Sequence, residues 1–192
     1  GHPITVISGD HLNKADVGAA IAREWYDREK VDAIFDTTNS AVSLAVIGVT
    51  KEKNRIVVIG GSSTVKITTD SCTPNSIQYV YDANSLSNVT AKALIDQGKK
   101  TWYFITVDFA FGHGLEKTTT AVVNAAGGKV LGAVRHPLNT ADFSSYILQA
   151  QASGAQVIGL ANGGTDTINA IKTAAQFGVS PKQSVASLLT FI

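Results

Sequence analysis

The feature that most constrains the fold is a repeated alternation between short apolar runs and longer amphipathic stretches. The amphipathic stretches place apolar residues on one helical face, as Val17, Ile21 and Trp25 do at steps of four residues. Strands are predicted at residues 3–8, 32–36, 55–60, 76–80, 101–107, 129–135, 155–161 and 185–192. Helices are predicted at residues 14–29, 40–54, 85–98, 116–128, 142–154 and 165–178. This order predicts an α/β fold with parallel sheets, right-handed crossovers and helices on both faces.

Residues 71–87 interrupt the alternation, because Pro74 and several small polar residues surround a strand that leads directly into a helix. A second series of strands and helices begins at Thr101. We therefore expect two Rossmann-like lobes, residues 1–82 and 83–192, with a crossover at 81–85. The chain opens and closes in a predicted strand and contains no methionine, so we expect a fragment in which both lobes are partial.

The charge balance excludes several classes of partner. Sixteen basic and fifteen acidic side chains give a net charge of +1, and no run of Lys or Arg exceeds two residues. Such a chain lacks the basic surface expected for nucleic-acid binding. Its apolar runs are far shorter than the roughly 20 residues that cross a bilayer.

Catalytic and cofactor motifs are missing from the sequence. It contains no GxGxxG turn, no P-loop, no GxSxG elbow and no HExxH pair, and its four histidines are scattered. We therefore expect no catalytic residue, no metal site and no cofactor, and a protein that is not an enzyme. An α/β enzyme with Asp108 or His113 as a base is a minor alternative. We expect His136, which precedes Pro137 in a predicted loop, to face solvent.

Polar residues gather where the predicted strands end. The loops concerned are residues 8–11, 36–40 and 60–64 in the first lobe, and 108–114, 136–143 and 161–167 in the second. Small ligands bind beyond the carboxyl ends of parallel strands, and free N–H groups at helix N-termini hold carboxylates there. Helix capping alone would explain about half of these Ser, Thr, Asn and Asp residues.

Two aromatic residues follow the strand at 101–107, where small polar residues are the usual choice. If Phe109 and Phe111 alternate across the strand end, one ring faces the core and the other faces the space between the lobes. Phe111 would then be an apolar surface for a ligand, and Gly112 would allow a close backbone approach. Ordinary burial of both rings is the competing interpretation.

The order of these segments resembles the type I periplasmic solute-binding proteins of ABC transporters, specifically the branched-chain amino-acid group and its aromatic-acid-binding relatives. The resemblance covers essentially the whole chain. Three motifs carry it: the DFAFGHG turn at 108–114, the GGSST loop at 60–64 and the TADFS segment at 140–144. From this resemblance we expect the first lobe to lack its first strand and helix, and the second lobe to lack its C-terminal part.

The resemblance implies a fold of the periplasmic-binding-protein-like I type, in which two hinged lobes close over a small ligand. By position, the ligand-contacting residues would be Thr38, Asn39, Ser40, Ser62, Ser63, Thr64, Tyr81, Phe111, Asn162 and Thr165. For Tyr81, which lies at the crossover, an ordinary packing role at the hinge is an equal alternative. In that family the first-lobe residues hold the ligand carboxylate and an aromatic residue at the Phe111 position contacts the rest.

The function implied is that of a periplasmic or membrane-tethered extracytoplasmic protein that delivers a small carboxylate to an ABC permease. The ligand would be an aromatic acid, an aliphatic acid or a branched-chain amino acid, and we expect a monomer. A ligand-sensing domain of a receptor or regulator with the same fold is the alternative. The sequence leaves the ligand and the permease partner open.

Overall fold

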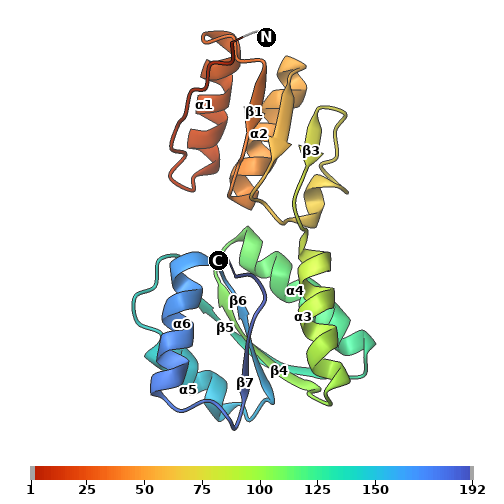
Figure 1. Ribbon diagram of the computed structural model, residues 1–192, viewed down its shortest axis with the longest axis vertical. Coiled ribbons are helices and arrows are strands. Elements are labelled where there is room, and N and C mark those ends of the chain that lie inside the picture. The colour runs from red at the N-terminus through yellow and green to blue at the C-terminus, as the bar shows by residue number, and fades with distance from the viewer. Residues whose placement is uncertain (1–2, 191–192) are drawn as a thin grey trace. The chain divides into compact units, whose positions relative to one another are not determined.

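The computed structural model describes residues 3–190. The chain divides into two compact units, the first ending at Val80 and the second beginning at Tyr81. The first unit contains α1 (Ala15–Asp27), β1 (Ala33–Phe35), α2 (Ser40–Lys53), β2 (Ile56–Ile59), the 3-10 helix η1 (Val65–Ile67) and β3 (Ser76–Gln78). The second contains α3 (Ala83–Asp96), β4 (Thr101–Val107), α4 (Ala110–Ala125), β5 (Lys129–His136), α5 (Ser144–Ala152), β6 (Val157–Ala161), α6 (Gly164–Gln176) and β7 (Ser184–Ser187) (Figure 1).

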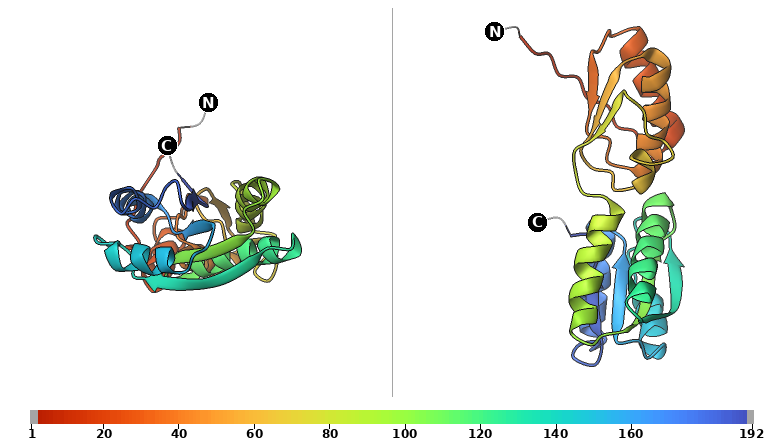
Figure 2. Two further views of the ribbon diagram at one scale, coloured as in Figure 1. Left: turned by 90° about the horizontal axis from the view of Figure 1, so that it is seen from below. Right: turned by 90° about the vertical axis from the view of Figure 1, so that its right-hand side faces the viewer.

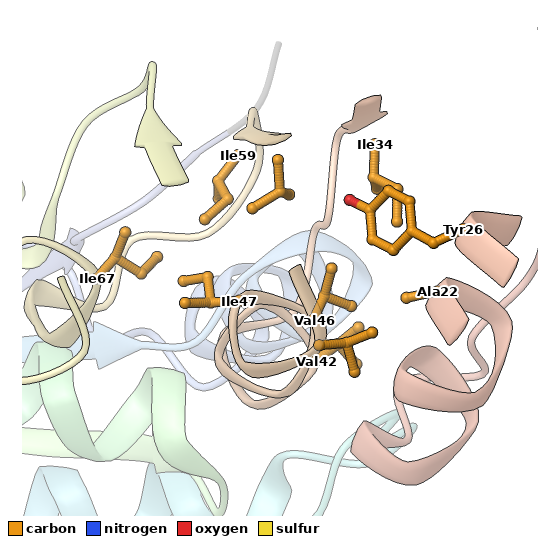
Figure 3. Packing of buried hydrophobic residues seen from close by; sticks show 10 residues of the cluster. Ala22, Tyr26, Ile34, Val42, Val46, Ile47, Ile59 and Ile67 are labelled. Carbon is orange, nitrogen blue, oxygen red and sulfur yellow. The ribbon is translucent and has the colours of Figure 1, made fainter. Parts of the chain in front are cut away.

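The first unit has a three-stranded parallel sheet in the order β1-β2-β3. Its strands alternate, so Ile34, Val57 and Ile59 point to one face, where they pack with α1 and α2. Figure 3 shows this core. The Tyr26 hydroxyl adds a polar link, since it donates to the Ile56 carbonyl over 3.0 Å.

The opposite face of this sheet is exposed in the described part of the chain. Both helices lie on the same side of the strands (Figure 2). The side chains of Phe35, Ile56 and Ile77 are 69%, 49% and 52% exposed. The first unit therefore presents an apolar sheet face beside its helix-covered one.

The second unit has a four-stranded parallel sheet in the order β5-β4-β6-β7. Helices α3 and α4 cover one face, and α5 and α6 cover the other (Figure 2). Side chains of β4 alternate between the two faces of the sheet. Trp102 and Phe104 lie on one face, and Ile105 lies on the other, where it packs in the cluster under α5 and α6. The expected α/β architecture with parallel sheets is confirmed.

The strand predicted at residues 3–8 is wrong. Residues 3–10 have no regular structure, and the side chains of Ile4 and Val6 are 88% and 83% exposed. An apolar run becomes a strand only beside another strand that pairs with its backbone, and none of the described strands pairs with this segment. The last predicted strand is also displaced, since β7 ends at Ser187; residues 191–192 of that prediction lie outside the described residues.

The placement of the two rings was also mispredicted. Strand β4 ends at Val107 and α4 begins at Ala110, six residues before the helix predicted at 116. Phe109 is therefore the N-cap of α4 and Phe111 lies in its first turn, so the rings do not alternate across a strand. The early start depends on Gly112, because a Cβ there would lie 2.2 Å from the Val107 carbonyl oxygen and 3.0 Å from that of Ala161.

We predict that Gly112→Ala lowers the free energy of unfolding by about 1–3 kcal/mol or more, because the methyl group meets backbone that cannot move aside. Gly114→Ala is the matched control in the same helix, since a Cβ there meets no atom within 4 Å. That control should gain about 0.5–1 kcal/mol from the better helix propensity. Urea unfolding of both variants measures the difference, and equal stability of the two would contradict the packing described here.

Candidate functional site

The loops after β1 and β2 lie against each other in the first unit. Parallel strands end at the same sheet edge, and Phe35 pairs in register with Val58. Two glycines allow the contact: a Cβ on Gly60 would lie 2.9 Å from the Asp36 carboxylate, and one on Gly61 would lie 3.0 Å from the Thr38 Cα. Sequence reasoning assigned GGSST to a site but did not foresee this role for its glycines.

A cluster of buried hydroxyl and amide side chains results. Its members, each at most 7% exposed, are Thr37, Asn39, Ser40, Ser43, Ser62 and Ser63. The Ser62 hydroxyl donates to Ser40 Oγ over 3.2 Å and so joins the two loops. The Ser62 carbonyl accepts from the Gln78 side chain over 2.9 Å, which ties the cluster to β3.

Within this hydroxyl cluster the pairing is uneven. Ser43 Oγ donates to the Thr37 carbonyl over 3.1 Å and also bonds the Thr37 hydroxyl over 2.8 Å. Ser63 Oγ is buried but has no hydrogen-bond partner among the described residues. A buried hydroxyl without a partner costs stability, and Ser63 therefore differs from the paired members of the cluster. Thr37 and Ser43 were not predicted as site residues, although both lie in the DTTNSAVS run.

Asn39 is the N-cap of α2. Its side-chain Oδ1 accepts from the backbone N–H groups of Ala41 and Val42 over 2.9 and 3.1 Å. The cap explains Asn39 without a ligand, as the capping interpretation allowed. Thr38 is exposed and bonds His11 Nε2 over 3.4 Å, and Thr64 is half-buried at the start of η1.

In the second unit, the rings of Phe109 and Phe111 lie together at the start of α4. Their centroids are 6.0 Å apart, and both side chains are half-buried. Phe111 also adjoins the turn before α6, since a Cβ on Gly163 would lie 3.7 Å from its ring. Asp108 and His113, the residues of the enzymatic alternative, are exposed and hydrogen-bonded to each other, with 2.8 Å between Oδ1 and Nε2.

The expectation that His136 faces solvent is wrong. Its imidazole is fully buried at the end of β5, against the rings of Phe143 and Tyr146 at centroid distances of 4.8 and 5.8 Å. Burial lowers the pKa of His136, although the Pro137 carbonyl and the Asp166 carboxylate oppose the shift. From the sequence, His136 was assigned to a loop because it precedes a proline. In the structure it is the last residue of β5 and packs against aromatic rings.

Asn162 is also fully buried, and its amide is occupied within the protein. Its Nδ2 bonds His136 Nε2 over 3.1 Å, and its Oδ1 accepts from the Thr167 hydroxyl over 2.7 Å. Thr165 is exposed in the first turn of α6. Nearby, Asp166 Oδ2 accepts from the Asn139 N–H over 3.2 Å, while its buried Oδ1 has no partner among the described residues.

Tyr81 is the first residue of the second unit and is half-buried, and burial raises the pKa of its phenol.

The other predicted site residues form two groups, one in each unit. Thr38, Asn39, Ser40 and the segment 62–64 lie together at the sheet edge of the first unit. Phe111, Asn162 and Thr165 lie around the starts of α4 and α6 in the second unit.

Other kinds of site find no support in the described residues. Within residues 3–190, no three His, Cys, Asp or Glu side chains are grouped so that they could hold a metal ion. No helix in this range is both long enough and apolar enough to span a membrane.

Comparison with known proteins decides the family. The profile described as "Periplasmic binding protein" matches residues 1–192. This chain belongs to the periplasmic binding protein family.

Three relatives illustrate the match. A periplasmic binding protein from Burkholderia mallei has a TM-score of 0.94 and 50% identity, over 98% of this chain and 50% of that chain. A branched-chain amino acid ABC transporter periplasmic ligand-binding protein from Burkholderia xenovorans LB400 has a TM-score of 0.78 and 39% identity, over 96% of this chain and 50% of that one. Leu/Ile/Val-binding protein homolog 6 of Brucella abortus is 29% identical over 137 residues, 71% of this chain and 35% of its own length.

The chain thus spans about half the length of the two structures and about a third of the Brucella protein. All three relatives are named as binding proteins and not as enzymes. These names agree with the expectation that the chain is not an enzyme. Periplasmic binding proteins are an extracytoplasmic family.

The Asn39 cap gives a test of local structure. Asn39→Ala removes the acceptor of two N–H groups and should lower the free energy of unfolding by about 1 kcal/mol. Asn39→Ser, which keeps a capping oxygen, should recover most of the loss in chemical denaturation. A serine variant as unstable as the alanine variant would show that the side-chain cap is not what stabilises α2.

Proposed function

We propose that this protein is an extracytoplasmic solute-binding component of an ABC uptake system, and that it captures a small carboxylate between two hinged lobes. The observation that carries the proposal is the buried and unpaired hydroxyl of Ser63. A ligand oxygen that accepts a hydrogen bond from Ser63 would remove the cost of burying that group.

The hydroxyl cluster suits a carboxylate for three reasons. Ser40 Oγ accepts from Ser62, which leaves the hydrogen of the Ser40 hydroxyl available for donation. The cluster lies at the N-terminal end of α2, a helix of 14 residues whose dipole favours negative charge there. The segments 36–40 and 60–64 contain no Lys or Arg, so the anion would be held by dipoles and hydroxyls and not by a basic side chain.

The apolar part of the ligand would contact Phe111. This ring is half-buried beside Phe109 and adjoins the turn at Gly163, so it is supported from two sides. A flat apolar surface suits an aromatic ring or a branched aliphatic chain. The names of the Burkholderia xenovorans and Brucella relatives support branched-chain amino acids as one ligand class.

Binding would be coupled to closure. Neither group of residues surrounds a small molecule by itself, so the closed form would be stabilised by contacts that only the ligand completes. The chain passes from one unit to the other between Val80 and Tyr81, and we place the hinge there. The closed form would then be recognised by an ABC permease.

Ligand screening tests the proposal directly. We expect benzoates, other aromatic acids or branched-chain amino acids to raise the melting temperature by about 6–12 °C at a hundredfold excess over Kd, because such an excess adds about 3 kcal/mol. Differential scanning fluorimetry with a panel of small carboxylates and matched amides measures this. No shift with any acid in the panel would refute the proposal.

Ser63 gives a sharper test, because stability and binding should change in opposite directions. Ser63→Ala removes an unpaired buried hydroxyl, so the free energy of unfolding should stay the same or rise. Ligand affinity should fall by about 1–2 kcal/mol, which is roughly 5- to 30-fold. Calorimetric titration and urea unfolding measure the two quantities.

Ser43→Ala is the matched control, because Ser43 is equally buried but paired with Thr37. It should lose about 1 kcal/mol of stability through the unpaired Thr37 groups. Its affinity for the ligand should change little. If Ser63→Ala behaves like Ser43→Ala, the Ser63 hydroxyl has a structural role and the ligand site lies elsewhere.

A further inference from the structure

A buried series of hydrogen bonds links the end of β5 to the start of α6. His136 Nδ1 bonds the Pro137 carbonyl over 2.9 Å, and His136 Nε2 bonds Asn162 Nδ2 over 3.1 Å. Asn162 Oδ1 then accepts from the Thr167 hydroxyl over 2.7 Å. His136 and Asn162 are fully buried and Thr167 is 3% exposed, so water does not compete for these bonds.

The Pro137 carbonyl fixes the protonation state along this series. A carbonyl only accepts, so the nitrogen that faces it, Nδ1, must carry the imidazole hydrogen. In the neutral ring Nε2 then has a lone pair, and it requires a donor. Asn162 must therefore present its NH2 group to His136 and its oxygen to Thr167. Neutral His136 thus determines the orientation of the Asn162 amide.

A second proton on His136 is incompatible with that orientation. Nε2–H would face the NH2 group of Asn162, and two donors would stand 3.1 Å apart. The amide would have to rotate by about half a turn, so that Oδ1 accepts from Nε2–H and Nδ2 donates to Thr167 Oγ1. The Thr167 hydroxyl then changes from donor to acceptor in this bond, and its own hydrogen loses the acceptor that Asn162 provided.

The charged and titratable groups around His136 come from three elements. Asp166 of α6 acts on it electrostatically and has a buried, unpaired Oδ1. Tyr146 of α5 places its ring 5.8 Å away. Asp108 follows β4 and donates its backbone N–H to the His136 carbonyl, but its carboxylate is paired with His113. Burial outweighs the favourable field of Asp166, which keeps the pKa of His136 below its usual value.

We propose that His136 is a positioning residue whose neutral form holds Asn162 and the turn at 162–165, and whose protonation releases that turn. This segment leads into the first turn of α6 and adjoins Phe111 through Gly163. Where the proposed function holds, this makes ligand affinity depend on pH through a group that does not touch the ligand. The effect on the turn itself is independent of any ligand.

The state of the ring is tested first, without a ligand. In the full chain with 15N-labelled histidine, correlation spectra at pH 7.5 should show His136 as the neutral form with the hydrogen on Nδ1. Free imidazole favours hydrogen on Nε2, so this signature is specific. His136 should also titrate below pH 6.5. A hydrogen on Nε2, or titration at or above pH 6.5, overturns the proposal.

Stability against pH provides the second readout. The pKa of His136 is lower in the folded chain than in the unfolded one, so the unfolded chain takes up the proton first. The contribution of His136 to stability therefore falls as the pH drops below about 6.5 and levels off below the folded pKa. His136→Gln should remove this decrease, whereas His113→Gln, an exposed histidine on α4, should retain it. Equal pH profiles in all three proteins contradict the proposal.

Asn162→Asp should reverse the effect. A carboxylate at this position accepts from Nε2–H and favours the protonated ring, so His136 should titrate at higher pH than in the wild-type chain. The same histidine spectra measure the change. An unchanged or lower titration midpoint would show that residue 162 does not determine the charge state of His136.

Affinity links this network to the proposed function. With benzoate and L-leucine as probes, the Kd of a binding probe should rise by up to tenfold per pH unit below the His136 titration, and His136→Gln should abolish this dependence. If Kd depends on pH in the same way in the wild type and in His136→Gln, the protonation of His136 does not affect ligand binding. Binding of neither probe at any pH counts against the proposed function, while the histidine spectra still decide the role of His136.

Discussion

Close backbone contact at the carboxyl ends of the parallel strands is the constraint on which both units depend. Gly60 and Gly61 allow the loop after β2 to lie on the loop after β1, and Gly112 allows α4 to begin against the ends of β4 and β6. A side chain at any of these positions would separate the polar groups that the strands bring to one edge. The hydroxyl cluster and the position of Phe111 are therefore consequences of backbone contact, and not only of the residues that carry the chemistry.

Much of this architecture could be predicted because it is local. Apolar runs and amphipathic stretches identified β1 to β6 and the six α-helices, since burial on one face imposes a period on each element. The prediction at residues 3–8 was wrong because pairing depends on a distant strand, which an apolar pattern cannot reveal. The start of α4 was missed because its first turns contain two glycines, and contact with the sheet overrides their low helix propensity.

The candidate site was predictable to a similar extent. Position after a strand identified Ser40, Ser62 and Ser63 as polar groups at one sheet edge, because parallel strands end together. A residue's position in the sequence does not reveal whether its hydroxyl is hydrogen-bonded. The structure shows that the Ser43 hydroxyl is paired and that the Ser63 hydroxyl is not, within the part of the chain that the structure describes. His136 was misassigned for a related reason, since its burial depends on contacts with Phe143, Tyr146 and Asn162, which the sequence around residue 136 does not reveal.

The exposed face of the first sheet has a practical consequence. Phe35, Ile56 and Ile77 present a flat hydrocarbon surface with no helix over it in the described chain. Such surfaces adhere to one another, to detergents and to fluorescent dyes such as ANS. Light scattering, or the fluorescence of such a dye at constant temperature, will therefore include a contribution from the uncovered sheet. A drop in either signal after adding a compound is not by itself evidence that a ligand has bound at the hydroxyl cluster.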